Sequence, residues 1–208
     1  MTFLQLRQKA QAYPIFQIAD VVKWFPNARK TTIRNQLSLW AKKKYVKPIR
    51  RGMYQLEEYE IADPFILAPL LYPSSYLSLE TALHAHGMIP DIPFSVTSVT
   101  ARKTATFHTD SYGVFSYSHV KPSLFFGFRI ITTPLKYSYR LAVPEKALFD
   151  YFYLKSPGVD NPPGFVEELR LSIPEEFSFQ QMTKWQKLIP TSLKRFHRIL
   201  NAFFQQYA

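Results

Sequence analysis

Basic side chains alternate with small polar ones along residues 28–43, and these residue types contact nucleic acids. Arginine and lysine neutralise phosphates, whereas asparagine, serine, threonine and arginine form hydrogen bonds with base edges and phosphate oxygens. This chemistry is non-covalent recognition rather than catalysis. The candidate residues in this segment are Arg29, Lys30, Thr31, Thr32, Arg34, Asn35, Ser38 and Lys42.

An amphipathic helix over residues 28–43 would hold these side chains together. At about 100° per residue, Ile33, Leu37 and Trp40 fall on one face and predict a buried stripe. The polar candidates fall on the opposite face or beside it. Leu39 also points outward, and the sequence offers no reason for an apolar residue there.

The next segment, residues 45–56, predicts a β-hairpin. Two short apolar runs flank a turn at Arg50, Arg51 and Gly52, where glycine provides the tight backbone. Lys47, Arg50 and Arg51 add basic groups that we expect to contact the DNA backbone. Residues 3–13 and 15–25 each predict a helix, so the order is three helices and then a hairpin.

This order predicts a winged helix-turn-helix over residues 1–57. In that fold the third helix enters the major groove and the hairpin, or wing, rests on the backbone or an adjacent groove. Double-stranded DNA is therefore the expected partner, and RNA is the alternative. An RNA-recognition strand would need a basic-aromatic pattern that SLFFGFRII lacks.

The distribution of charge separates a basic N-terminal segment from a neutral remainder. Residues 1–56 contain 12 Lys and Arg and a single acid, Asp20, which gives this segment the whole net charge of +11. Residues 57–208 contain 14 basic and 14 acidic residues. A compact segment with such an excess needs a polyanion nearby. The acidic run EEYEIAD marks the boundary, and residues 62–208 are expected to form a second domain.

The second domain is expected to be α+β, with a mostly antiparallel sheet. Strands are predicted over 94–100, 105–109, 112–120 and 125–133, and helices over 78–87, 144–154, 164–172, 178–189 and 191–207. In PEKALFDYFYL, Glu145 compensates the helix dipole and Lys146 pairs with Asp150 at i, i+4. We interpret these three residues as structural rather than catalytic.

Several classes of protein are disfavoured by what the sequence lacks. There is no cysteine, no apolar run near the roughly 18 residues of a membrane span, and no phosphate-binding glycine loop. His84 and His86, two residues apart on a helix, point to different sides and cannot share a metal. The start of the chain does not read as a signal peptide. We therefore expect a cytoplasmic protein with no metal, cofactor or membrane partner.

Two blocks of the sequence resemble the AbiEi antitoxin family. They are YLSLETALHAHGMIPDIPFSVTSVTARKT, and FFGF followed by LAVPEKALFDYFYL. Within the first block, Glu80 and Thr81 depart from the small residues of the family pattern. RRGMYQL looks like the wing strand of many winged-helix regulators. The match covers roughly residues 15–155, and the last 50 residues carry no recognised motif.

The resemblance implies an N-terminal winged helix that represses its own operon at an operator, expected to contain inverted repeats. It also implies a C-terminal antitoxin domain and a cognate nucleotidyltransferase toxin as a partner, with direct contact between the two left open. The sequence thus predicts a non-enzymatic repressor and antitoxin. The alternatives are a DNA-processing nuclease and a ligand-sensing regulator without a toxin.

Overall fold

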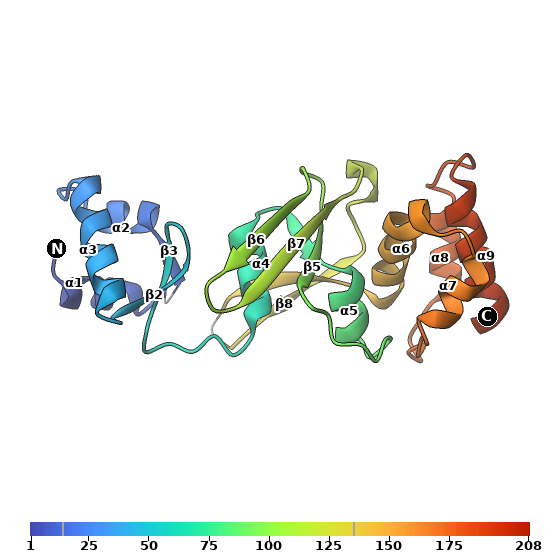
Figure 1. Ribbon diagram of the computed structural model, residues 1–208, viewed down its shortest axis with the longest axis horizontal. Coiled ribbons are helices and arrows are strands. Elements are labelled where there is room, and N and C mark those ends of the chain that lie inside the picture. The colour runs from blue at the N-terminus through green and yellow to red at the C-terminus, as the bar shows by residue number, and fades with distance from the viewer. Residues whose placement is uncertain (14, 135) are drawn as a thin grey trace. The chain divides into compact units, whose positions relative to one another are not determined.

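The computed structural model describes residues 1–13, 15–134 and 136–208, and the fold is a mixed α+β one (Figure 1). The chain divides into two compact units. Unit 1 comprises Met1–Pro64 and His108–Gly113, and unit 2 comprises Phe65–Phe107 and Val114–Ala208.

Unit 1 contains three helices, a short strand and a hairpin among its described residues. Its small sheet has the order β1-β3-β2, and both pairs are antiparallel. The hairpin predicted over residues 45–56 is confirmed. The elements are α1 (Phe3–Ala10), β1 (Ile15–Gln17), α2 (Ile18–Trp24), α3 (Lys30–Lys42), β2 (Val46–Arg50) and β3 (Met53–Leu56).

The prediction of one helix over residues 15–25 was wrong in its first turn. Ile15–Gln17 forms β1, which pairs with Met53–Gln55 of β3, and the helix begins only at Ile18. Apolar spacing alone could not reveal this, because the strand depends on a partner far along the chain. Pairing with β3 buries Ile15 and Phe16.

Unit 1 has its own hydrophobic core. The side chains of Leu6, Phe16, Val21, Ile33 and Leu37 are almost completely buried and belong to one cluster. Helices α1, α2 and α3 therefore each contribute to the same core.

The larger sheet has six described strands in the order β6-β7-β5-β4-β9-β8. It is mixed: β4 pairs antiparallel with β5 and β8 with β9, whereas β4–β9 and β5–β7 are parallel. The expectation of a mostly antiparallel sheet therefore needs correction. The strands are β4 (Ser75–Leu77), β5 (Val96–Thr100), β6 (Ala105–Thr109), β7 (Gly113–His119), β8 (Phe128–Thr132) and β9 (Ser138–Ala142).

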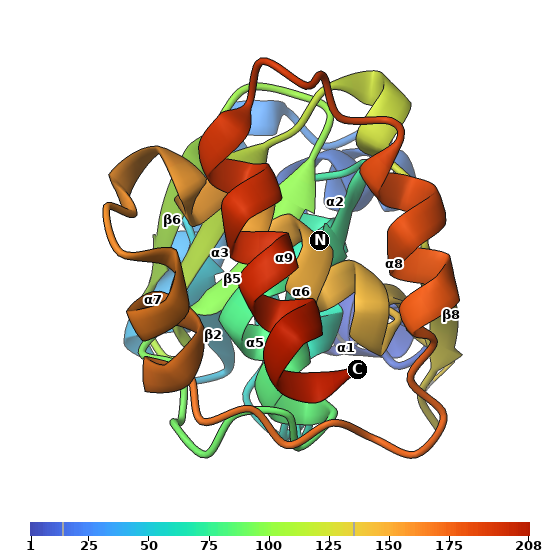
Figure 2. The same ribbon diagram turned by 90° about the vertical axis from the view of Figure 1, so that its right-hand side faces the viewer.

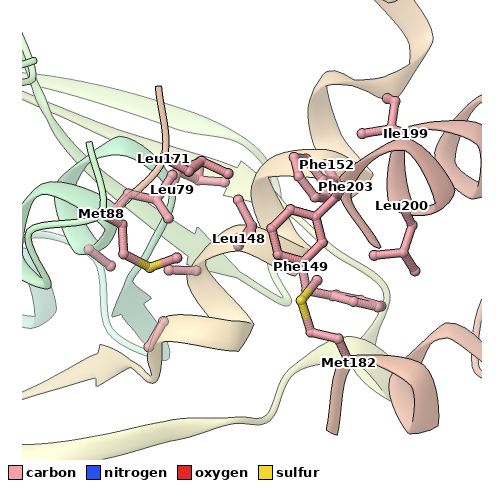
Figure 3. Packing of buried hydrophobic residues seen from close by; sticks show 14 of the residues in the cluster. Leu79, Met88, Leu148, Phe149, Phe152, Leu171, Met182, Ile199, Leu200 and Phe203 are labelled. Carbon is pink, nitrogen blue, oxygen red and sulfur yellow. The ribbon is translucent and has the colours of Figure 1, made fainter. Parts of the chain in front are cut away.

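The C-terminal helices of unit 2 gather around α6. Figure 2 shows α9 in front of α6, with α7 and α8 to either side. Figure 3 shows Leu148, Phe149 and Phe152 of α6 packed near Met182 and Phe203. The helices are α4 (Leu67–Leu71), α5 (Leu79–Ala85), α6 (Pro144–Lys155), α7 (Pro162–Glu168), α8 (Phe179–Gln186) and α9 (Lys194–Tyr207), with short 3-10 turns η1 (Pro64–Ile66), η2 (Pro122–Leu124) and η3 (Ser156–Gly158).

Candidate nucleic-acid interface

Helix α3 is held by the apolar stripe that its sequence predicts. Ile33 and Leu37 are completely buried, and Trp40 is 7% exposed. The ring of Trp40 packs edge-on against Phe3 of α1, with the ring centroids 5.6 Å apart. One face of α3 is thus fixed to the core of unit 1, and its opposite face is left to solvent.

Every predicted contact residue on or next to α3 is exposed, and these are Arg29, Lys30, Thr31, Thr32, Arg34, Asn35, Ser38 and Lys42. None of the basic groups of α3 forms an ion pair with an acid in the part of the chain that the structure describes. Their charge is therefore available to an external anion.

The start of α3 also suits an anion. Arg29 occupies the N-cap position, and its side chain does not cap the helix. The first turn contains no acidic residue. The first backbone N–H groups of a helix lack partners within the helix, and the helix dipole makes this end attractive to phosphate.

A groove of about 580 Å³ opens beside this end of the helix. Arg29 and Thr32 border it, together with Met1 and Gln5 of the α1 region and the turn from Trp24 to Ala28. Two of the predicted contact residues therefore share one concave surface in unit 1.

Leu39 is the unexpected feature of the exposed face. Its side chain is 49% exposed and is not part of the hydrophobic core of unit 1. It lies one helical turn after Asn35 and two turns after Thr32. An apolar group thus stands among hydrogen-bonding side chains.

The hairpin is anchored to α2. Gly52 at the turn has a φ of +82°, which favours glycine, and its carbonyl accepts a hydrogen bond from the backbone N–H of Ile18 at 3.0 Å. Arg51 at the tip is exposed, whereas Lys47 and Arg50 are half-buried. Of the three wing candidates, Arg51 is the most accessible.

Unit 2 contains a buried ionic cluster on α6. Lys146 and Asp150 form an ion pair with side chains 0% and 1% exposed. The other carboxylate oxygen of Asp150 accepts hydrogen bonds from the hydroxyls of Tyr76 at 2.8 Å and Ser78 at 2.9 Å. The ammonium group of Lys146 also lies 4.8 Å from the ring centroid of Phe126. The predicted i, i+4 pair is confirmed.

Burial dominates the protonation energetics of this cluster. It lowers the pKa of Lys146 and raises the pKa of Asp150, and the attraction between the two groups opposes both shifts. Burial also raises the pKa of Tyr76. Because the cluster is closed to solvent, no substrate reaches it, and we interpret it as structural.

Other polar residues near this cluster also have structural roles. The carboxylate of Glu145, 8% exposed, accepts a hydrogen bond from the backbone N–H of Ser178, the N-cap residue of α8, at 2.7 Å. Nε2 of His86 lies 2.8 Å from the carbonyl oxygen of Ala142. Ser78 is the N-cap residue of α5, but its side chain makes no hydrogen bond to that helix and instead donates to Asp150.

Gly127 in FFGF is required by close packing. Its φ is +74°, and a Cβ atom there would lie 2.9 Å from Cγ of Lys146. The two sequence blocks that carry the AbiEi resemblance therefore meet at one buried cluster. Sequence reasoning anticipated the pair but missed Tyr76, Ser78 and Gly127 as its partners, because they are distant in sequence.

The described residues contain no group of three or more His, Asp or Glu side chains that could hold a metal ion. Among those same residues, no helix combines the length and apolar character needed to cross a membrane.

The sequence matches no family model and no curated protein. Among solved structures, the fold is similar to that in the crystal structure of the RV2827C protein from Mycobacterium tuberculosis. The TM-score is 0.57 at 12% identity, over 96% of this chain and 76% of that chain. At this identity the likeness concerns the fold alone.

Proposed function

We propose that this protein is a sequence-specific DNA-binding repressor that acts as the antitoxin of a type IV toxin–antitoxin system. Unit 1 represses its operon by binding an operator, and unit 2 counteracts a nucleotidyltransferase toxin. The protein itself performs no catalysis. The observation that carries DNA binding is the exposed polar face of α3, in a segment that holds the whole net charge of +11.

In this proposal unit 1 is a winged helix-turn-helix domain. Helices α2 and α3 form the helix-turn-helix, and the β2–β3 hairpin is the wing. Its support is the element order α1, β1, α2, α3, β2, β3 and the antiparallel three-stranded sheet. Helix α3 then enters the major groove, and Arg51 at the hairpin tip contacts a phosphate.

Three side chains of α3 read bases. Asn35 pairs with adenine through its amide, and Arg34 pairs with guanine through its guanidinium group. Leu39 contacts the C5-methyl group of thymine, the apolar feature of the major groove. This role gives a physical reason for an exposed leucine on a polar face. Arg29, Lys30 and Lys42 neutralise phosphates and supply affinity without sequence preference.

The antitoxin role rests on the resemblance to the AbiEi family. The two sequence blocks that carry it build the buried cluster of Lys146, Asp150, Tyr76 and Ser78. They therefore specify the architecture of unit 2 rather than a reactive site. This arrangement is compatible with an antitoxin domain that acts without reactive groups of its own.

A two-part experiment tests the proposal. DNA from upstream of the gene should bind the full-length protein at least tenfold more tightly than an unrelated duplex of equal length, at the same salt concentration. Expression of the protein should also restore growth to cells that make the nucleotidyltransferase encoded beside it. Equal affinity for both duplexes would refute the repressor role, and failure to restore growth would refute the antitoxin role.

A ligand-sensing regulator is a second candidate, because unit 2 contains a cavity of about 230 Å³. Charged and polar side chains of His86, Arg129, Glu145 and Glu176 line it beside apolar ones. This volume is below the roughly 300–1,000 Å³ of most ligand pockets. If no nucleotidyltransferase gene is adjacent and a small polar metabolite changes operator affinity, this second candidate replaces the antitoxin role.

A further inference from the structure

Strand β8 is one edge of the six-stranded sheet, and β6 is the other. Figure 2 shows the two strands at opposite sides of the view. β8 pairs with β9 from Phe128 to Thr132 in a regular register without a bulge. Its central residue, Ile130, is 68% exposed. An edge strand of this kind offers its free side to another strand.

The backbone of β8 alternates between groups that face β9 and groups that face away from it. The carbonyl of Gly127 accepts a hydrogen bond from the backbone N–H of Val143 at 3.0 Å, so Gly127 faces the partner strand. Because an antiparallel ladder alternates, the N–H and C=O groups of Phe128, Ile130 and Thr132 point to the open side. In the described part of the chain, no residue outside the β8–β9 pair forms a hydrogen bond with these backbone groups.

The two edges of the sheet differ in how well they resist further pairing. Natural edge strands are commonly protected by lysine, proline or bulges. On β6 the exposed residues are Thr106 and His108, which are both polar. β8 has the sequence FRIIT, which contains neither lysine nor proline, and it exposes Ile130 beside Arg129. The open side of β8 is thus the less protected edge.

The sequence of β8 is complementary to itself. A twofold axis through Ile130 would pair two copies of the strand in antiparallel fashion, with each outward N–H opposite an outward carbonyl. Ile130 then faces Ile130 of the second copy, and such a pair of β-branched side chains is favourable across strands. On the same face Phe128 lies opposite Thr132. On the other face Arg129 lies opposite Ile131, so no like charges oppose each other directly.

The distribution of charge beside β8 also favours a second copy. Arg129 and Ile131 line a cavity of about 230 Å³, to which Glu145 and Glu176 contribute carboxylates. In the twofold pair, Arg129 of the second copy arrives opposite Ile131 and therefore beside this cavity. The guanidinium group of one copy thus meets a surface with two acidic side chains on the other.

We propose that β8 is a dimerisation edge, through which two copies of this chain join their sheets around a twofold axis at Ile130. Two five-residue strands bury less than the roughly 1,200 Å² of a stable interface, so the dimer is weak and exchanges with the monomer. The proposal concerns unit 2 and does not depend on the DNA-binding role of unit 1.

Disulfide trapping tests both the contact and its register, because the natural chain contains no cysteine. Full-length I130C is oxidised under mild conditions without DNA and analysed by non-reducing electrophoresis. In the proposed pair the two Cα atoms at position 130 lie about 5.5 Å apart, within the disulfide range of about 4.4–6.8 Å. T132C is the matched control, because Thr132 is exposed on the same face but its two copies would lie about 14 Å apart.

We expect I130C to form at least tenfold more covalent dimer than T132C under the same conditions. T106C, on the β6 edge, should behave as T132C does. A mixture of R129C and I131C, one of them carrying a size tag, should form the mixed dimer, because these positions face each other at about 4.5 Å. This mixture leaves Ile130 in place, so it tests the register even if I130C folds poorly.

Equal yields of covalent dimer from I130C, T132C and T106C would indicate random collision of thiols and would overturn the proposal. Absence of covalent dimer from I130C and from the mixture would also overturn it, whether the edge then stays free or pairs with an extended segment of another protein. Because α3 is unaltered in every variant, these outcomes leave the proposed role of unit 1 untouched.

Discussion

Removing either partner of the Lys146–Asp150 pair should severely destabilise unit 2. Both side chains are almost fully buried, and breaking such a pair leaves one uncompensated charge, which costs about 3–5 kcal/mol. K146M and D150N each remove one charge at similar volume. The double variant K146M/D150N removes both charges of the pair, and the amide oxygen of asparagine can still accept from Tyr76 and Ser78. We therefore expect the double variant to be more stable than either single variant.

The two single variants should respond to pH in opposite directions. Burial raises the pKa of Asp150, and without Lys146 nothing charged opposes that shift. A carboxyl group with a raised folded-state pKa stabilises the fold most below its unfolded value of about 3.9, and this contribution is lost as pH rises through the folded-state pKa. The destabilisation of K146M should therefore shrink between about pH 7 and pH 5.

For D150N the sign is reversed. Burial lowers the pKa of Lys146, so the unfolded chain binds more protons, and stability rises as the pH increases. This variant should gain stability between about pH 7 and pH 9. Urea unfolding at each pH, followed by circular dichroism, measures both effects. Single-variant losses below about 1 kcal/mol, or pH slopes of the same sign, would refute the assignment of a buried ion pair.

Three further predictions concern packing and DNA contacts. G127A should destabilise the protein by about 1–2 kcal/mol from its positive φ alone, and the contact with Lys146 should add to this loss. G87A is the matched control, because a Cβ atom at Gly87 meets nothing within 4 Å. Equal denaturation midpoints of G127A and G87A would contradict the packing argument. Replacing operator thymines by uracil should weaken binding by the unaltered protein but leave L39A unaffected; equal losses would exclude Leu39 as a methyl contact. If about six basic groups of unit 1 neutralise phosphates, log K should fall against log salt with a slope near −5, and a slope shallower than about −2 would argue against phosphate contacts.

The sequence predicted α3 and the hairpin well because each depends on local patterns. The stripe of Ile33, Leu37 and Trp40 specifies which side of α3 is buried, so the exposure of Asn35 follows from spacing. The turn at Gly52 requires a positive φ that glycine readily adopts. These features involve residues a few positions apart, for which periodicity and turn chemistry are informative.

The missed features depend on distant partners. Strands β4 and β9 are short, and their parallel pairing at Leu77 and Leu141 brings together residues that no local pattern relates. β1 was predicted as helix because its apolar residues fit both periodicities. The hydrogen bonds to Asp150 from Tyr76 and Ser78 span more than 70 positions. Half-burial of Arg50 likewise follows from packing of the folded unit rather than from its position in the turn.

The central claim is that the exposed face of α3 reads DNA sequence while the wing supplies affinity. The most direct measurement compares the ratio of operator to non-specific affinity in the unaltered protein, in N35A and in R50A/R51A, at one salt concentration. N35A should lose about 1–3 kcal/mol of that preference, roughly 5- to 150-fold in the ratio, with little change in non-specific binding. R50A/R51A should weaken both affinities and leave the ratio nearly unchanged. An unchanged ratio in N35A, or the same uniform loss in both variants, would contradict the account.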